Sequence, residues 1–105
     1  MKPPYYAVIF TSKKKRYADD YDQTAERMKE LSYEQPGFLG ISSARNPDGN
    51  GITVCYWDSL EAIKKWKANN EHQYAQEMGK NEWYESYSIR IAKVEEEYSW
   101  NGEEV

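Results

Sequence analysis

The sequence predicts one α+β domain with the element order β-α-β-β-α-β, the ferredoxin-like arrangement around a four-stranded antiparallel sheet. Three observations predict it. The 105 residues suit a single domain. Runs rich in aromatic and β-branched residues alternate with segments whose apolar residues recur at helical spacing. Turn residues separate these segments. We place the domain at residues 1–98 and expect a mobile tail over residues 99–105.

The first half of the chain supplies a strand and a helix. Residues 5–11 are rich in aromatic and β-branched side chains, which is typical of a strand, and the basic run at 13–16 is expected to be a solvated loop. A helix is expected to begin at Asp19 or Asp20, since either is a good N-cap, and to end at Pro36-Gly37. The residues that recur at helical spacing are Tyr21, Ala25, Met28 and Leu31 or Ser32.

The middle of the chain predicts a hairpin. Residues 38–44 and 52–57 are strand-like runs, and the Asp-Gly and Asn-Gly steps between them favour a tight reversal.

The second half predicts a helix, a short helical segment and a strand. The helix begins at Asp58 or Ser59, with Glu61 completing a capping box behind Asp58. Its inner face is expected to carry Leu60, Ile63 and Trp66. After the Asn69-Asn70 interruption, residues 71–78 form a turn or short helix closed by Gly79, and residues 83–96 form the last strand.

Both faces of the first, third and last strands are apolar. Tyr5, Ala7 and Ile9 alternate with Tyr6, Val8 and Phe10, for example. Helices can cover only one face of such a sheet, so the other would expose a large aromatic patch. We therefore expect a homodimer formed through the sheet faces.

The composition of the chain limits which kinds of partner and which kinds of site are expected. The net charge of −4 disfavours nucleic acid and anionic membranes, and no apolar run is long enough for a signal peptide or a membrane span. The single cysteine, Cys55, excludes an intramolecular disulfide and is expected to be an inert core thiol. With one histidine and one cysteine seventeen positions apart, no metal site is expected. The expected compartment is the cytoplasm.

Two polar side chains stand out as candidates for chemistry. His72 is the only histidine, and its ordinary pKa near neutrality suits a general base; the competing interpretation is that it only bonds nearby backbone. Arg90 lies inside an otherwise uncharged stretch of strand and needs a carboxylate or a ligand anion. An ion pair across the dimer interface, or with Glu26 or Glu61, is the structural alternative.

Three motifs give the chain a resemblance to a known family. They are Gln35-Pro36-Gly37-Phe38-Leu39-Gly40, Tyr56-Trp57-Asp58-Ser59-Leu60-Glu61-Ala62, and Trp66 followed by Asn70-Glu71-His72. Over residues 5–98 the sequence resembles the antibiotic biosynthesis monooxygenase (ABM) domains of the dimeric α/β barrel superfamily. The resemblance implies a pocket between the sheet and the helices of each subunit. It implies that Trp66, His72, Tyr74 and Trp83 stand near it.

The resemblance leaves several functions open. The leading hypothesis is a cofactor-free monooxygenase acting on a small electron-rich aromatic such as a phenol, quinol or anthrone, with His72 as catalytic base and Trp66, Tyr74, Trp83 and Arg90 binding the substrate. No cofactor is expected, neither haem nor flavin, and a haem-binding or haem-degrading relative is the less favoured enzymatic alternative. Haem-degrading relatives place an axial histidine where this chain has Gln76 and Glu77, and an asparagine on the first strand, where this chain has none.

Two non-enzymatic classes remain as alternatives. One is a dimer that only holds a small molecule. The other is RNA binding, because RNA-recognition motifs share the element order. The strand at 52–57 lacks their basic-Gly-aromatic signature, and the acidic balance argues further against RNA.

Overall fold

The element order of the domain is β-α-β-β-α-α-β. The computed structural model describes residues 1–18 and 20–102. Its elements are β1 (Tyr5–Lys14), α1 (Tyr21–Tyr33), β2 (Phe38–Arg45), β3 (Asn50–Trp57), α2 (Leu60–Lys67), α3 (Asn70–Met78), the π-helical turn η1 (Gly79–Trp83) and β4 (Tyr84–Val94). The predicted fold class is confirmed, with the second helical region divided into α2 and α3.

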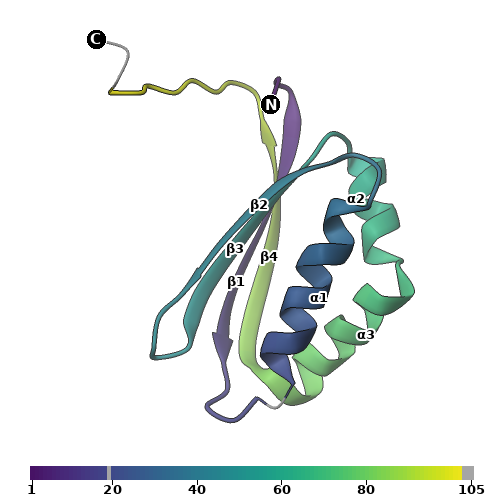
Figure 1. Ribbon diagram of the computed structural model, residues 1–105, viewed down its shortest axis with the longest axis vertical. Coiled ribbons are helices and arrows are strands. Elements are labelled where there is room, and N and C mark those ends of the chain that lie inside the picture. Colours follow the sequence, from purple (N-terminus) through teal and green to yellow (C-terminus); the bar gives the residue numbers. More distant parts are fainter. Residues whose placement is uncertain (19, 103–105) are drawn as a thin grey trace.

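The four strands form one antiparallel sheet in the order β2-β3-β1-β4, and the three helices lie on one side of it (Figure 1). The first strand is therefore internal, hydrogen-bonded to β3 and β4. Tyr6 of β1 pairs with Trp57 of β3 and Lys93 of β4. Two residues later, Val8 pairs with Cys55 of β3 and Ile91 of β4. These residues share the helix-covered face.

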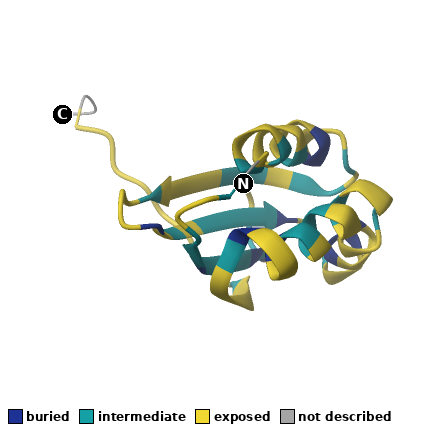
Figure 2. Ribbon diagram, turned by 90° about the horizontal axis from the view of Figure 1, so that it is seen from below, coloured by how far each residue is buried: buried dark blue, intermediate teal, exposed yellow. Residues whose placement is uncertain are grey.

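The core lies between that face and the helices. Trp57 is fully buried and packs with Leu31, Ala62, Ile63 and Trp66. Figure 2 shows the buried residues as short stretches, with the outward turns of the helices exposed, and no residue of α3 is fully buried. Leu60 was expected on the inner face but is 54% exposed. It is the first residue of α2, and the buried stripe of that helix begins two residues later.

The basic run at residues 13–16 does not begin as a loop. Lys13 pairs with Asn50 on one side and Ser86 on the other, and Lys14 pairs with Tyr84. The amide of Lys14 also donates to the carbonyl of Gly49, at 2.9 Å. Because β1 has a partner on both edges, the ladder hydrogen bonds hold these two lysines in the strand despite their charge.

The helix starts differ in part from the predicted caps. Asp20 precedes α1 without a side-chain capping bond, and Asp19 lies outside the described residues. The cap of α2 is Ser59, whose hydroxyl accepts from the amide of Ala62 at 3.1 Å, so the capping box behind Asp58 is wrong. The backbone amide of Asp58 instead donates to the carbonyl of Gly37, at 2.8 Å.

Gly37 joins the first half of the fold to α2. Its φ of +85° is a left-handed conformation, and a Cβ there would lie 2.4 Å from Asp58 Oδ1 and 2.7 Å from the Cβ of Ala62. Only glycine satisfies both constraints without strain. α1 ends at Tyr33, three residues before the expected Pro-Gly pair, and this pair sets the distance between β2 and α2.

The other sheet face carries no helix. Its residues on β1, β3 and β4 are Tyr5, Ala7, Ile9 and Thr11, then Ile52, Val54 and Tyr56, and then Ser88, Arg90, Ala92 and Val94, and β2 adds Gly40, Ser42 and Ala44. We call this set the helix-free face. Ile52 is 43% exposed there, whereas Tyr5 and Ala7 are buried. The ring of Tyr5 meets that of Tyr56 edge-on at 5.7 Å.

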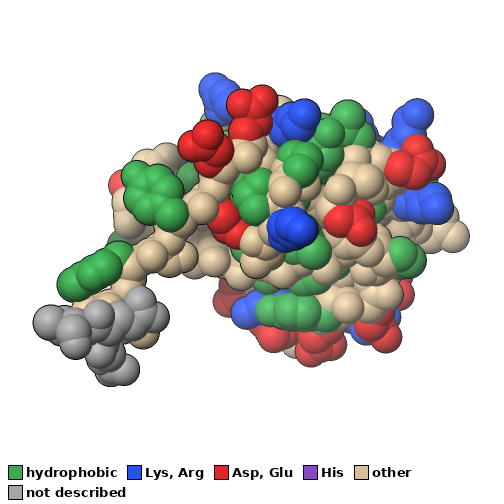
Figure 3. Space-filling model, turned by 90° about the horizontal axis from the view of Figure 1, so that it is seen from above, with side chains coloured by type: hydrophobic (Ala, Val, Ile, Leu, Met, Phe, Trp, Pro, Cys, Tyr) green, Lys and Arg blue, Asp and Glu red, His purple; other side chains and the backbone are tan. Residues whose placement is uncertain are grey.

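The segment after β4 leaves the body of the domain. Residues 95–102 contain no helix or strand, so β4 ends two residues before its expected end, and the segment extends away from the sheet (Figure 1). Near its start Glu97 accepts from Tyr5 Oη at 2.7 Å. Further along, Tyr98 and Trp100 are 96% and 81% exposed, and hydrophobic side chains stand apart from the body in Figure 3. Residues 103–105 of the expected tail lie outside the described residues, and the mobility of residues 99–102 stays a prediction.

Candidate functional site

The first turn of α3 brings together the histidine and an aromatic wall. Asn69 caps this helix, and its side-chain oxygen accepts from the amides of Glu71 (3.0 Å) and His72 (3.2 Å). The cap fixes the direction in which α3 leaves α2. His72 is thereby placed against Trp66 of α2, with ring centroids 4.2 Å apart and planes inclined by only 14°.

The contacts of His72 define its tautomer. Its Nδ1 lies 3.0 Å from the backbone carbonyl oxygen of Trp66. A carbonyl oxygen can only accept, so in the neutral ring Nδ1 carries the proton and Nε2 keeps its lone pair. Burial lowers the pKa of His72 below its ordinary value, against the opposing effect of the hydrogen bond to Trp66. The imidazole is therefore neutral at pH 7 and can accept a proton at Nε2.

A groove of about 400 Å³ lies beside this turn, between α1 and α3. Its lining residues are Gln23, Thr24, Arg27, Met28, Asn70, Glu71 and Tyr74. We call it the α1–α3 groove. Met28 also packs against the core cluster that contains Trp66, so the groove reaches down to the core. Its walls combine apolar carbon with amide, hydroxyl and charged groups, which suits a small molecule with a few polar handles.

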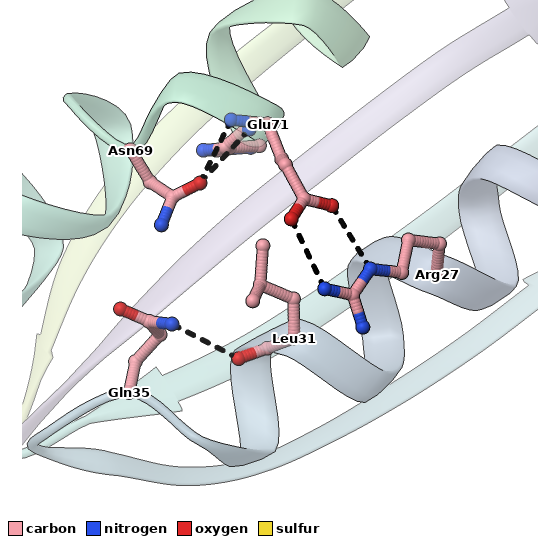
Figure 4. Close-up of polar contacts among 6 residues, drawn as sticks. Arg27, Leu31, Gln35, Asn69 and Glu71 are labelled. Atoms are coloured by element: carbon pink, nitrogen blue, oxygen red, sulfur yellow. Dashed lines mark hydrogen bonds and ion pairs between the residues drawn. The ribbon is translucent and has the colours of Figure 1, made fainter.

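An ion pair spans the α1–α3 groove. The guanidinium of Arg27 donates from Nε and Nη2 to the two carboxylate oxygens of Glu71, at 2.9 and 3.0 Å (Figure 4). These hydrogen bonds lower the pKa of Glu71 and raise that of Arg27. Both side chains are about half exposed, so water screens the pair. A bidentate pair of this geometry fixes the separation of the two helices more than it stabilises the fold.

Three of the five residues predicted for the site lie on α2 and α3. Trp66 and His72 are stacked, whereas Tyr74 lines the α1–α3 groove, and His72 is not among the residues that line it. Trp66 itself is buried, and the ring of Trp57 lies 6.0 Å from it on the core side. It does not line the α1–α3 groove, nor a second groove of about 480 Å³ that is lined mainly by residues of α2 and α3. Its position is that of a core residue that supports His72.

The remaining two predicted residues lie elsewhere. Trp83 is buried in η1, where its ring meets that of Tyr21 at 5.5 Å and 90°. Arg90 is exposed on the helix-free face, opposite Ile9, and donates to Ser88 Oγ at 3.3 Å. The expected ion pair with a helix acid is wrong, because the helices cover the opposite face of the sheet.

Two features of the site were not predicted from the sequence. Arg27 and Glu71 are 44 positions apart, on different helices, and no local pattern links them. Met28 was expected as a core residue, and its second role as groove lining depends on where α3 lies.

Other expected features can be compared directly with the described residues. Cys55 is partly buried against the core, burial raises the pKa of its thiol, and its Sγ accepts from Trp57 Nε1 at 3.3 Å, which agrees with an inert core thiol. Within residues 1–18 and 20–102, no three His, Cys, Asp or Glu side chains are grouped as metal ligands. In the same ranges, no helix is long and apolar enough to cross a membrane.

Comparison with known proteins gives a family and a fold. The family model described as "Antibiotic biosynthesis monooxygenase" matches residues 4–78. Among curated proteins, the uncharacterized protein YqjZ of Bacillus subtilis (strain 168) is 56% identical over 94 residues, which is 90% of this chain and 82% of that protein.

Solved structures resemble this one at low sequence identity. SnoaB, a cofactor-independent oxygenase from Streptomyces nogalater, superposes with a TM-score of 0.76 at 10% identity, covering 90% of this chain and 97% of that one. Rv0793 from Mycobacterium tuberculosis superposes with a TM-score of 0.78 at 11% identity, covering 90% and 99%. At such identities the likeness shows a shared fold.

Proposed function

Because the chain belongs to the antibiotic biosynthesis monooxygenase family, we propose that it is a monooxygenase that oxidises a small electron-rich aromatic with O2 and without a cofactor. His72 is the base of this reaction, and the α1–α3 groove admits the substrate. The observation that carries the proposal is a neutral, half-buried imidazole whose tautomer is fixed by the carbonyl of Trp66. The cofactor-independent oxygenase SnoaB, which shares the fold, supports the absence of a cofactor by analogy.

The reaction needs no external reductant. His72 Nε2 removes a proton from the phenol, quinol or anthrone, and the resulting carbanion or phenolate transfers an electron to O2. The two radicals combine at carbon to form a peroxide, which loses water as the carbon becomes a carbonyl. One oxygen atom enters the product and the other leaves as water. An anthrone methylene gives up four electrons in becoming a carbonyl, and O2 takes up four.

The surroundings of His72 suit this chemistry. The stacked ring of Trp66 holds the imidazole in one orientation and excludes water from one of its faces. Tyr74 is 59% exposed at the wall of the groove, so its hydroxyl can meet a polar group of the substrate there. The Arg27–Glu71 pair keeps α1 and α3 at a fixed separation, which keeps the groove open.

We expect O2 uptake when the purified protein is mixed with anthrone or 1,4-dihydroxynaphthalene. The measurement is an oxygen electrode trace together with mass spectrometry of the product formed under 18O2, on protein treated with a chelator and free of flavin absorption. One 18O atom per product molecule is expected. Saturable binding of these compounds without oxygen uptake would overturn the proposal in favour of the non-catalytic binding dimer. Oxygen uptake that appears only after addition of haem would favour the haem-dependent class.

The assembly of this enzyme is, in our proposal, a homodimer through the helix-free face. Most side chains of that face are aliphatic or aromatic while all three helices lie on the other side, so a monomer leaves residues such as Ile52 in contact with water. A self-complementary contact between the helix-free faces of two copies removes both faces from water.

Light scattering tests the dimer with a matched pair of substitutions. Wild type is expected to have the mass of two 12.4 kDa chains at micromolar concentration. Ile52→Asp places a charge on the helix-free face and should shift the mass towards one chain, whereas Leu60→Asp, at a comparably exposed leucine on α2, should not. A wild-type mass of one chain would refute the dimer.

A further inference from the structure

A second polar cluster surrounds the side chain of Arg45, at the end of β2. Its guanidinium donates to the carbonyl of Gly49 (2.6 Å), to Ser12 Oγ (2.8 Å) and to Tyr21 Oη (3.2 Å). It also lies 5.6 Å from the ring centre of Tyr21 and 5.7 Å from that of Tyr84. We call Ser12, Tyr21, Arg45 and Tyr84 the Arg45 cluster. It lies on the helix-covered face, beside the start of α1.

The positive charge of the Arg45 cluster has no carboxylate partner among the residues that the structure describes. The three groups that accept from Arg45 are neutral. A second cation lies close by, because Lys14 Nζ is 4.9 Å from the ring centre of Tyr21. Half-buried guanidinium groups are normally neutralised by an anion, whereas here only neutral hydrogen-bond acceptors and cation–π contacts offset the loss of water. The cluster is thus electrostatically complementary to a negatively charged group.

Two donors of the cluster are unused by the described part of the protein. Tyr84 Oη donates to Tyr21 Oη at 3.2 Å, so the oxygen of Tyr21 already accepts from Tyr84 and from Arg45. Its own proton remains to be donated. Nε of Arg45 also has no acceptor there, since its three bonds come from Nη1 and Nη2. Burial, followed by the bond to Tyr21, raises the pKa of Tyr84 far above its ordinary range, so Tyr84 stays protonated.

An aromatic surface adjoins these donors. Phe10 contacts Tyr84 at 5.3 Å and Tyr87 at 5.4 Å between ring centres. Tyr87 is 37% exposed and Ile89 is 51% exposed, although both share the sheet face of Phe10. The helices therefore leave this part of β4 uncovered, and a flat apolar ring would bury it.

We propose that the Arg45 cluster binds the carboxylate of a planar aromatic acid, whose ring lies on the surface formed by Phe10, Tyr87 and Ile89. A carboxylate offers two oxygens to Nε–H of Arg45 and to the hydroxyl of Tyr21, and both bonds are charge-assisted. The site goes beyond the proposed reaction. It is built from β1, β2, β4 and the first residue of α1, and it shares no residue with the α1–α3 groove.

Gly51 of β3 allows the guanidinium to lie where it does. A Cβ on this residue would be 2.7 Å from Cζ of Arg45 and 2.8 Å from Nη1. The Arg45 side chain is the part that can move, so Gly51→Ala should displace the guanidinium while leaving every charge in place. This substitution separates the position of the guanidinium from the net charge of the protein.

The test uses the full chain labelled with 15N and titrated with 2-naphthoate. We expect saturable shifts of the Arg45 Nε–Hε signal and of the Ser12 and Tyr21 amides. Gly51→Ala and Tyr21→Phe should each raise the Kd about tenfold or more, as expected for the loss of one charge-assisted hydrogen bond. Gly40→Ala is the matched control, because a Cβ there meets nothing closer than 4.0 Å. The neutral analogue 2-naphthol should bind at least tenfold more weakly than 2-naphthoate.

Three results would overturn the proposal. One is the absence of saturable shifts at millimolar 2-naphthoate. Another is a shift map centred on residues 70–74 instead of Arg45. The third is equal affinity of 2-naphthoate for wild type and for a folded Tyr21→Phe, a variant that keeps the ring and removes only the hydroxyl.

Discussion

Replacement of Trp57 by alanine is expected to remove most of the stability of the domain. Trp57 is fully buried at the end of β3, with the ring of Phe38 at 5.3 Å and that of Trp66 at 6.0 Å. Truncation of a buried tryptophan costs about 3 to 5 kcal/mol through lost burial and the cavity left behind. A small domain has only about 5 to 15 kcal/mol in all.

Urea unfolding followed by far-ultraviolet circular dichroism measures this loss. Trp100→Ala is the matched control, because Trp100 is 81% exposed on the segment after β4 and its removal should change the midpoint little. Equal midpoints for the two variants would show that the Trp57 environment is not the core of the fold.

Substitution of His72 is expected to lower kcat/KM for the proposed oxidation by about 10²- to 10⁴-fold, the range of general-base contributions. His72→Gln keeps an amide that can bond the carbonyl of Trp66 but cannot accept a proton at the position of Nε2. His72→Ala removes both. Gln73→Ala, at the next residue of α3, is the control for nonspecific damage to the helix. If His72→Gln retains wild-type kcat/KM, His72 is not the base.

The dependence of activity on pH distinguishes a catalytic role of His72 from a purely structural one. Because burial lowers the pKa of His72 below 6.5, the neutral base persists at pH 7 and is lost only below that lowered pKa. Wild-type activity should therefore fall on acidification with a midpoint under 6.5, and this acid limb should vanish in any residual activity of His72→Gln. The free energy of unfolding changes with pH in the same direction. The contribution of neutral His72 to stability is complete above pH 6.5, the ordinary pKa, and decreases as the pH falls towards the lowered pKa of the folded state.

Local signals in the sequence were sufficient for most of the fold. The Asp-Gly and Asn-Gly steps predicted the β2–β3 hairpin, and Pro36-Gly37 predicted the turn between α1 and β2, because these residues constrain the backbone wherever they occur. The stacked pair of Trp66 and His72 combines two predicted site residues. Nδ1 of His72 bonds backbone, as one interpretation of this residue expected, and its role as a base stays a prediction.

Contacts distant in sequence account for the rest. Lys13 and Lys14 belong to β1 because two other strands pair with them. The groove depends on the Arg27–Glu71 pair, and the Arg45 cluster joins residues of β1, β2, β4 and α1. No periodicity or motif in any one of these segments contains that information. The aromatic substrate, the cytoplasmic location and the lack of a cofactor remain predictions.

The internal position of β1 has a consequence for how the chain acquires its structure during synthesis. The first strand pairs with the last, and Tyr5 stands opposite Val94. Until β4 has been made, β1 can pair only with β3, and its other edge is left with unsatisfied backbone groups that invite pairing with a neighbouring chain. Closing so long a loop costs entropy before any contact compensates for it. A nascent chain that stalls before β4 is thus the form of this domain most exposed to aggregation, and slow translation of residues 84–94 should lower the soluble yield.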